Sequence, residues 1–216
     1  MKRRGAAIDG FLVLDKPVGI GSTPALGQAR RALGAAKAGH AGTLDPLASG
    51  VLVIAFGEAT KLSRFVMDGA KRYRFGVRWG EARATDDAEG EVVATSVVRP
   101  TRAAIEAALP RFLGMIEQVP PAYSAIKLAG RPAYARARAG EAVALAPRTV
   151  RIDSLALVER PGPDRAVFEL ACGKGTYVRS LARDLAQAFE PLAMSTSSGG
   201  CRWGPSGSRT RLRWIN

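Results

Sequence analysis

The residues best suited to chemistry lie in one short stretch, from Gly39 to Gly50. It contains the sole histidine of the chain, His40, and one carboxylate, Asp45, and it runs directly into the apolar segment 51–56, which is typical of a buried strand. A turn-rich loop beside a rigid strand often carries binding or catalytic side chains. Pro46 disfavours the helical region for the residue before it, so we expect the Asp45 carboxylate on an extended segment. The structural alternative is an aspartate that hydrogen-bonds within its own turn.

Two further segments carry polar or charged side chains that can do chemistry. Segment 85–90 contains three carboxylates; they admit a metal site, but an exposed acidic turn before a strand is the preferred interpretation. The glycine-rich segment 173–176 is not a phosphate loop, because Phe168 stands where that motif needs its first glycine. We expect a strand-loop-helix junction that places Lys174 near a helix N-terminus, where a backbone phosphate can bind, or else a tight turn.

The charge balance is the most unusual property of the composition. Thirty-two Lys and Arg against nineteen Asp and Glu leave a net charge of +13 over 216 residues, with a pI of about 10.6. Such a balance is common in proteins that bind nucleic acid, although basic proteins also bind acidic membranes or simply remain soluble. No segment reaches the roughly 18 apolar residues of a membrane span.

The N-terminal segment and the cysteines indicate a cytoplasmic protein. The basic start, residues 1–5, is followed by a segment that interrupts any apolar core of a signal peptide, so we expect no export. Cys172 and Cys201 lie far apart, and the chain has no cysteine and histidine spacing typical of zinc. We therefore expect no disulfide framework, no metal and no membrane partner.

Periodicity indicates the elements that must position these residues. The clearest strand is 71–79, in which Tyr73 and other apolar residues alternate with Arg72, Arg74 and Arg78. Further strands are expected at 11–14, 51–56, 91–98, 150–158 and 166–171, the last two forming a hairpin, and helices at 23–33, 58–66, 101–112, 134–139 and 176–189. The segments 115–119 and 123–127 flank the pair Pro120-Pro121. Thr23 and Thr101 are the expected N-caps of two helices. Because strands and helices do not alternate regularly, we expect an α+β fold with a mixed sheet and flanking helices rather than a doubly wound fold.

Several segments resemble one family, in its order along the chain. The most specific is Gly-His-Ala-Gly-Thr-Leu-Asp-Pro at 39–46. It is joined by Asp15-Lys16-Pro17 and by the segments 57–61, 71–73, 85–90, 118–125, 134–140 and 174–179. With these segments, which together span about residues 10–190, the chain resembles the bacterial-type tRNA pseudouridine-55 synthases (TruB family), which isomerise a uridine in the T loop of tRNA. The resemblance implies the pseudouridine synthase catalytic fold, with a largely antiparallel central sheet.

The resemblance also implies roles for individual residues. Asp45 corresponds to the catalytic aspartate, and Arg179 to the cation that pairs with it. Tyr73 would stack on the target base and can relay the proton from C5, while Tyr177 and His40 would contact the flipped nucleotide or the loop around it. Candidates for RNA-phosphate contacts are the basic residues Lys16, Arg30, Arg31, Arg72, Arg74 and Lys174, each of which can equally be a solvated surface residue.

One carboxylate is enough for this reaction. The bond between C1′ and N1 of the uridine breaks, the uracil rotates and it rejoins through C5, without net redox change or hydrolysis, so no cofactor is expected. An ionised Asp45 can act as nucleophile at the sugar or the base, or can remove a sugar proton, and all three routes stay open. Flipping the uridine out of a structured loop costs a few kcal/mol, which stacking and basic contacts offset. The expected partner is the tRNA T stem-loop, with the chain acting as a monomer.

The chain departs from the family pattern at two places. Gly21 replaces a threonine before Ser22, and after about Ala193 a stretch rich in Ser, Thr, Gly and Arg replaces an apolar segment that ends in Leu-Arg-Arg. We expect a catalytic domain at 1–193, a divergent, disordered tail at 194–216 and no C-terminal RNA-binding (PUA-like) domain. A frameshift is one hypothesis for the tail. If residues 193–206 are encoded by G/C-rich codons, the same nucleotides read from one position earlier can encode the missing family segment. A natural divergent tail is the alternative.

Two other functions stay open at this point. A tRNA-binding protein that aids RNA folding without catalysis would account for an altered C-terminal part of the site. A glycosidase-like hydrolase would need a second carboxylate and a water molecule, and Asp86 and Asp87 are the nearest candidates.

Overall fold

The computed structural model describes residues 5–189. These residues divide into two compact units, a first unit of residues 5–72 and a second unit of residues 73–189. The segment 194–216, with its expected disorder and frameshift, lies outside the described residues.

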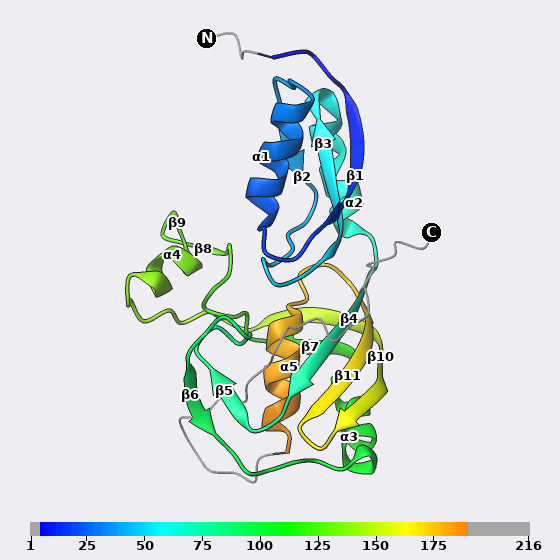
Figure 1. The fold of residues 1–216 in the computed structure, drawn as a ribbon, viewed down its shortest axis with the longest axis vertical. Coiled ribbons are helices and arrows are strands. Elements are labelled where there is room, and N and C mark those ends of the chain that lie inside the picture. The colour runs from blue at the N-terminus through cyan, green and yellow to red at the C-terminus, as the bar shows by residue number, and fades with distance from the viewer. Residues whose placement is uncertain (1–4, 190–216) are drawn as a thin grey trace. The chain divides into compact units, whose positions relative to one another are not determined.

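The first unit is a three-stranded antiparallel sheet with a helix over one face (Figure 1). Its strands are β1 (Gly10–Lys16), β2 (Ala38–His40) and β3 (Gly50–Phe56), in the order β1-β3-β2. Ala25 and Leu26 of helix α1 (Ser22–Ala32) belong to the same apolar cluster as Leu52 and Ile54 of β3, which fixes the helix on the sheet. The short helices η1 (Gly57–Leu62) and α2 (Ser63–Asp68) follow β3, where one helix over 58–66 was expected.

The start of α1 differs from the expected cap. The helix begins at Ser22 with Gly21 as its N-cap residue, and no side chain caps it. Thr23 therefore lies inside the first turn, and the prediction of a Thr23 cap is wrong. The Ser22 hydroxyl bonds instead to the main chain of Leu44, across the unit.

The second unit contains a four-stranded sheet in the order β4-β11-β10-β7. Its strands are β4 (Lys71–Arg78), β7 (Gly114–Gln118), β10 (Arg148–Gly162) and β11 (Arg165–Cys172), and β10 pairs antiparallel with both β7 and β11. Helices α3 (Arg102–Ala108), η2 (Leu109–Phe112) and α5 (Val178–Gln187) share one apolar core with this sheet. Figure 1 shows α3 and α5 beside the sheet. The other described elements are β5 (Glu81–Arg83) paired with β6 (Val92–Thr95), β8 (Lys127–Leu128) paired with β9 (Arg131–Pro132), and helix α4 (Ala133–Arg138).

The sequence patterns explain most of this architecture. In β4, Phe75 and Val77 are buried while Arg72 is exposed, as the alternation predicts. The Thr101 hydroxyl accepts a hydrogen bond from the Ala104 N–H (3.2 Å) and caps α3. The β10–β11 hairpin turns between Gly162 and Arg165. The α+β class, with antiparallel pairing and flanking helices, is thus confirmed.

Candidate active site

The loop that carries Asp45 connects β2 to β3 and is held by main-chain hydrogen bonds. The Asp45 carbonyl accepts from the Ala48 N–H (3.0 Å), which closes a tight turn. The Pro46 carbonyl accepts from the Gly19 N–H (2.8 Å), which joins the loop to the turn after β1. Asp45 is half-buried. Its backbone is therefore fixed while part of the residue is open to solvent.

Ser22 fixes the residue immediately before Asp45. Its buried hydroxyl accepts from the Leu44 N–H (2.8 Å) and donates to the Leu44 carbonyl (3.0 Å). The Ser22 side chain thus satisfies both the N–H and the carbonyl of Leu44. Because the site is buried, loss of these bonds would cost free energy that water cannot readily restore. Because Ser22 is the first residue of α1, the helix start sets the position of the Asp45 loop.

Lys16, the last residue of β1, is completely buried beside the same loop. Its ammonium donates to the carbonyls of Pro17 (2.8 Å), Ile20 (2.7 Å) and Ala48. These bonds use all three donors of the ammonium. Burial lowers the pKa of Lys16, while the nearby negative charge of Asp45 acts in the opposite direction. Lys16 therefore joins the turn after β1 to the Asp45 loop and places a cation near Asp45.

This geometry contradicts the prediction that Lys16 contacts an RNA phosphate. A phosphate contact needs an exposed donor, whereas the Lys16 side chain is out of reach of solvent and its donors are occupied by carbonyls. The physical reason is the position at the end of β1, where the chain turns inward and Lys16 pairs with Gly50 of the central strand.

His40 ends β2 opposite Ile54 of β3, five residues before Asp45. Its Nδ1 atom is buried, and no described residue supplies it with a hydrogen-bond partner. A buried polar atom of this kind usually has a partner, so the imidazole is a candidate to bind a ligand group. Its contact with the flipped nucleotide stays a prediction.

In the second unit, Arg179 stands in the first turn of α5 with only 5% of its surface exposed. Its guanidinium donates to the carbonyls of Thr85 (3.0 Å) and Tyr123 (3.0 Å), and Nη1 lies 3.5 Å from an Asp87 carboxylate oxygen. The predicted pairing of Arg179 with Asp45 joins residues of different units and stays a prediction. Within the second unit, the carboxylate beside Arg179 belongs to Asp87.

A second ion pair joins α5 to the same segment, 85–87. Arg183, one turn further along α5, donates to Asp86 (3.0 Å) and Asp184 (3.0 Å) and to the Val119 carbonyl (2.8 Å). Burial raises the pKa of Asp86, and the Arg183 charge acts in the opposite direction; burial likewise raises the pKa of Asp184. Asp86 also adopts a left-handed backbone conformation (φ 57°), which an aspartate tolerates better than most residues.

Segment 85–90 forms a turn before β6, as predicted, and Glu89 is exposed, but the prediction of exposure is wrong for Asp86 and Asp87. Asp86 and Asp87 are 8% and 5% exposed, because α5 supplies one arginine to each of them. A Cβ atom on Gly90 would lie 2.7 Å from the Thr85 nitrogen, so this glycine lets the loop close tightly. Carboxylates committed to these arginines are poorly placed to activate a water, which weakens the hydrolase alternative.

The predicted nucleotide contacts of the second unit lie near the start of α5 and on β4. The Tyr177 N–H donates to Gln118 Oε1 (2.8 Å), which holds the N-cap residue of the helix. Lys174 is exposed in the loop between β11 and α5, at the strand-loop-helix junction that the sequence predicts. Tyr73 is half-buried and packs against the core of the second unit. The nucleotide contacts of Tyr73 and Tyr177 and the phosphate contact of Lys174 stay predictions.

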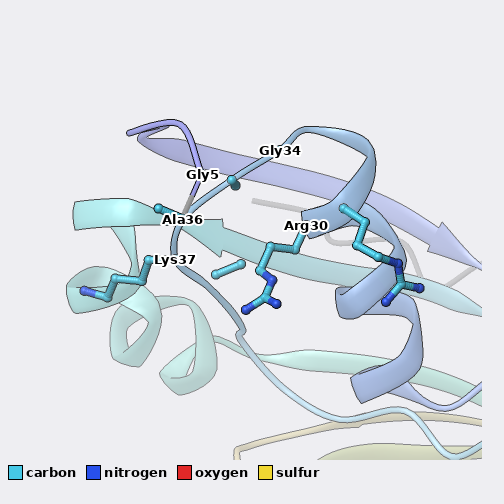
Figure 2. A pocket seen from close by; sticks show the side chains of 8 residues that line it. Gly5, Arg30, Gly34, Ala36 and Lys37 are labelled. Atoms are coloured by element: carbon cyan, nitrogen blue, oxygen red, sulfur yellow. The ribbon is translucent and has the colours of Figure 1, made fainter. Parts of the chain in front are cut away.

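The predicted phosphate contacts have different surroundings. Arg72 is exposed, whereas Arg74 forms an ion pair with Glu159, so a phosphate would have to compete with that carboxylate. Arg30 and Arg31 are exposed and line one pocket at the end of α1, together with Lys37 (Figure 2).

Neither a metal centre nor a membrane-spanning helix is found in the range 5–189. No three side chains of His, Cys, Asp or Glu gather there closely enough to hold a metal ion. No helix in this range has the length and apolar character needed to cross a membrane.

Comparison with known proteins identifies the family. The model of the TruB family pseudouridylate synthase N-terminal domain matches residues 30–178. The chain belongs to this family. Among TruB-family relatives, tRNA pseudouridine synthase B of Bradyrhizobium diazoefficiens is 62% identical over 185 residues, which cover 86% of this chain and 54% of the relative. The enzyme of the same name from Rhodospirillum rubrum is 54% identical over 211 residues, covering 98% of this chain and 68% of the relative.

Solved structures support the same fold. A crystal structure of a Cbf5-Nop10-Gar1 complex matches with a TM-score of 0.65 and 25% identity, over 94% of this chain and 47% of that chain. An H/ACA RNP bound to a substrate RNA containing 2′-deoxyuridine matches with a TM-score of 0.59 and 23% identity, over 89% and 46% of the two chains. This TruB-family chain spans about half the length of the first curated relatives that it matches, 54% and 49%.

Sequence reasoning missed three features of the candidate site. The Ser22 anchor and the Asp86–Arg183 pair join residues 22 and 97 positions apart, and single-sequence periodicity carries no signal for such pairs. Lys37 is a lone basic residue between small ones, and its proximity to the two consecutive arginines of α1 depends on the turn after that helix.

Proposed function

We propose that this TruB-family chain isomerises the T-loop uridine of tRNA, at position 55, to pseudouridine, with Asp45 as the catalytic residue. The observation that carries the proposal is the way the first unit builds the Asp45 loop. Ser22 fixes the preceding residue and Lys16 fixes the following turn, so the carboxylate is presented by a restrained backbone. Preorganised positioning of this kind is what an enzyme needs at a reacting group.

The proposed chemistry uses protein groups alone. An ionised Asp45 attacks the sugar or the base, or removes a sugar proton, as the C1′–N1 bond of the uridine breaks. The uracil rotates, C5 bonds to C1′, and the proton that leaves C5 is balanced by one taken up at N1. Tyr73 stacks on the base and Arg179 pairs with Asp45 in this proposal, while His40 and Tyr177 contact the flipped nucleotide. In this proposal the reaction needs no cofactor, and the protein acts as a monomer in the cytoplasm.

An assay for pseudouridine in a T stem-loop transcript tests the function. We expect product with the wild-type chain and none above background with Asp45→Asn, which keeps the size of the side chain but removes its charge. The matched control is Asp15→Asn, an exposed carboxylate at the end of β1 in the same unit. Wild-type activity in Asp45→Asn would refute the assignment of Asp45.

A catalytically silent tRNA-binding protein is the second candidate function. It is favoured by the sequence after about Ala193, where a stretch rich in Ser, Thr, Gly and Arg replaces the apolar segment of the family pattern. Transcript binding by the wild-type chain without pseudouridine formation would support this candidate over the isomerase. Release of free uracil would instead indicate the hydrolase, for which the buried ion pairs of Asp86 and Asp87 give no support.

A further inference from the structure

A basic pocket lies at the end of the first unit where α1 stops. It has a volume of about 710 Å³ and is lined by Arg30, Arg31, Lys37 and small residues, namely Gly5, Gly34, Ala35, Ala36 and Ala38. The long basic side chains come from two segments, α1 and the connection that leads into β2 (Figure 2). This volume is far above the ~10–15 Å³ of accessible space that a single water molecule needs, so the pocket is larger than a single small anion requires.

The charge of this basic pocket is uncompensated along its lining. All three charged side chains that line it are cationic, and no described lining residue is acidic. Glu58 is an acidic neighbour that interacts with Lys37, but its main partner is Lys61, with which it forms an ion pair. Three cations on the lining of one pocket attract a polyanion, because each of them can neutralise one phosphate. The Lys37 side chain extends away from Arg30 (Figure 2), so the cations would meet different phosphates of an extended ligand.

Helix capping does not account for these arginines. Basic residues in a last helical turn often interact with the free carbonyls there. In α1 those carbonyls have main-chain partners, since the Ala35 N–H donates to the Arg30 carbonyl and the Gly34 N–H to the Arg31 carbonyl (3.0 Å each). The arginine side chains are therefore not needed to end the helix.

The backbone around the basic pocket is rigid. Gly34 takes a left-handed conformation (φ 62°) directly after the α1 C-cap. The Ala6 N–H donates to the Gly34 carbonyl (2.7 Å), and the Ala36 N–H donates to the Ala6 carbonyl (3.0 Å). A Cβ atom on Gly5 would lie 2.7 Å from both the Gly34 oxygen and the Ala36 nitrogen, so the two segments meet closely. A rigid frame lowers the entropic cost of binding a ligand.

The register of the sheet separates this basic pocket from Asp45. Ala38, which lines the pocket, pairs with Phe56 at one end of β3, while the Asp45 loop enters β3 at Gly50, the other end. The seven residues of β3 span about 20 Å at ~3.3 Å per residue. The 11 residues of α1 span about 16 Å at ~1.5 Å each. At ~3.4 Å per stacked nucleotide, this separation equals about five nucleotides.

We propose that the basic pocket binds backbone phosphates of the RNA about five nucleotides from the uridine at Asp45. The RNA assignment rests on the proposed function; the site itself rests on the first unit alone. A stem that continues beyond the loop would supply such phosphates, whereas the target nucleotide would not reach them. The basic pocket therefore holds the stem, and it selects RNAs in which a stem flanks the target loop.

The test compares equilibrium binding of two transcripts, a T loop with its full stem and the same loop with a stem cut to two base pairs. The variant is Arg30→Gln/Arg31→Gln/Lys37→Gln, and the charge-matched control is Arg111→Gln/Arg148→Gln/Arg165→Gln, three arginines exposed on the second unit. With the full-stem transcript, we expect the variant to bind at least tenfold more weakly than wild type. The slope of log binding constant against log salt concentration should be smaller in magnitude for the variant than for wild type, by about two to three. For the short stem we expect variant and control to bind alike.

Two results would overturn the proposal. One is a variant that binds the full-stem transcript as the control does. The other is an equal loss for both transcripts, which would show general attraction of anions to positive charge. The thermal unfolding midpoint shows whether the triple variant is folded. If it is not, the single variants Arg30→Gln and Lys37→Gln replace it in the same binding comparison. Failure of the proposed function has a different signature: wild type would bind the stem as expected and form no pseudouridine.

Discussion

Lys16 shows how a buried cation can serve structure rather than substrate. It ends β1, has no exposed surface and donates to three carbonyls, those of Pro17 and Ile20 in the turn after β1 and that of Ala48 in the Asp45 loop. A lysine suits this position, because its single ammonium donates to three carbonyl acceptors that would otherwise be buried without partners.

Replacing Lys16 tests this role. Lys16→Met keeps most of the side-chain volume but leaves the Pro17, Ile20 and Ala48 carbonyls without their donor. We expect a loss of about 2–4 kcal/mol in the free energy of unfolding, at ~1 kcal/mol or more per abandoned acceptor. Urea unfolding measures the change. Lys61→Met, in an exposed pair with Glu58, is the control and should leave the midpoint unmoved; equal midpoints for both variants would contradict this role.

The Asp86–Arg183 pair gives a prediction on stability and pH. Removing the cation in Arg183→Ala leaves the buried Asp86 and the half-buried Asp184 without it, so we expect a loss of about 3 kcal/mol. Asp86→Asn should cost under about 1 kcal/mol at pH 7, because asparagine tolerates the left-handed backbone and needs no buried charge. Chemical unfolding of the two variants decides between them, and a larger loss in Asp86→Asn would refute this ranking.

The pH dependence follows from the raised pKa of Asp86. An acid whose pKa is higher in the folded chain binds its proton more tightly there. Its stabilising contribution is therefore complete below the unfolded value of 3.8 and is lost as the pH rises through the folded value. We expect Asp86→Asn to lack this part of the decline. Unfolding free energies measured from pH 4 upward should show a flatter profile for the variant than for wild type, and parallel profiles would contradict the assignment.

At the scale of elements, the start of α1 and the Asp45 loop are coupled by hydrogen bonds and should move together. Ser22 connects them through both polar groups of Leu44, so movement of the helix start moves the residue before Asp45, the proposed catalytic residue. The Gly21 N-cap contributes no side-chain bond, which leaves the Ser22 hydroxyl for this contact.

Ser22→Ala tests the coupling. The Leu44 N–H and carbonyl both lose their partner, which should cost about 1–2 kcal/mol of stability and loosen the loop. If the proposed function holds, we expect pseudouridine formation to fall about tenfold. The neighbouring Thr23→Ala, at an exposed position without a capping bond, is the matched control in the same assay and in thermal unfolding. A loss in Thr23→Ala as large as that in Ser22→Ala would argue against a specific anchor.

The sequence predicts elements better than it predicts partners. Local periodicity is enough for β4, for the β10–β11 hairpin and for the Thr101 cap, because these depend on neighbouring residues. It fails for Lys16, whose donors turn inward, and for the 85–87 segment, whose carboxylates are buried by arginines more than 90 positions away. Such pairings depend on which surfaces meet in space, and no local pattern encodes that.

At the scale of the whole molecule, the net charge of +13 is unevenly compensated. Several arginines of the second unit, including Arg74, Arg99 and Arg183, have carboxylate partners. The basic pocket of the first unit has no acidic lining residue in the described part of the chain. Long-range attraction of RNA should therefore depend on a subset of the basic residues rather than on their total number.

Salt titration measures the size of that subset. Each neutralised phosphate contributes ~0.7–0.9 to the magnitude of the log–log slope of binding against salt. With Arg30, Arg31, Lys37 and Arg72 in contact, we expect a slope near −3 for a T stem-loop. Fluorescence anisotropy between about 50 and 300 mM KCl is a suitable measurement. A slope near zero would contradict an electrostatic interface, and a slope several times steeper would mean that many of the paired arginines also contact RNA.

The burial of Lys16 has a practical consequence for labelling experiments. Exposed amines such as Lys174 and Lys61 should react with an acylating reagent at once, whereas the Lys16 amine can react only when the first unit opens. Mass spectrometry of that one modified peptide would therefore time the opening of the first unit independently of the second. The labelling rate of Lys16 therefore reports how often the unit that carries Asp45 opens.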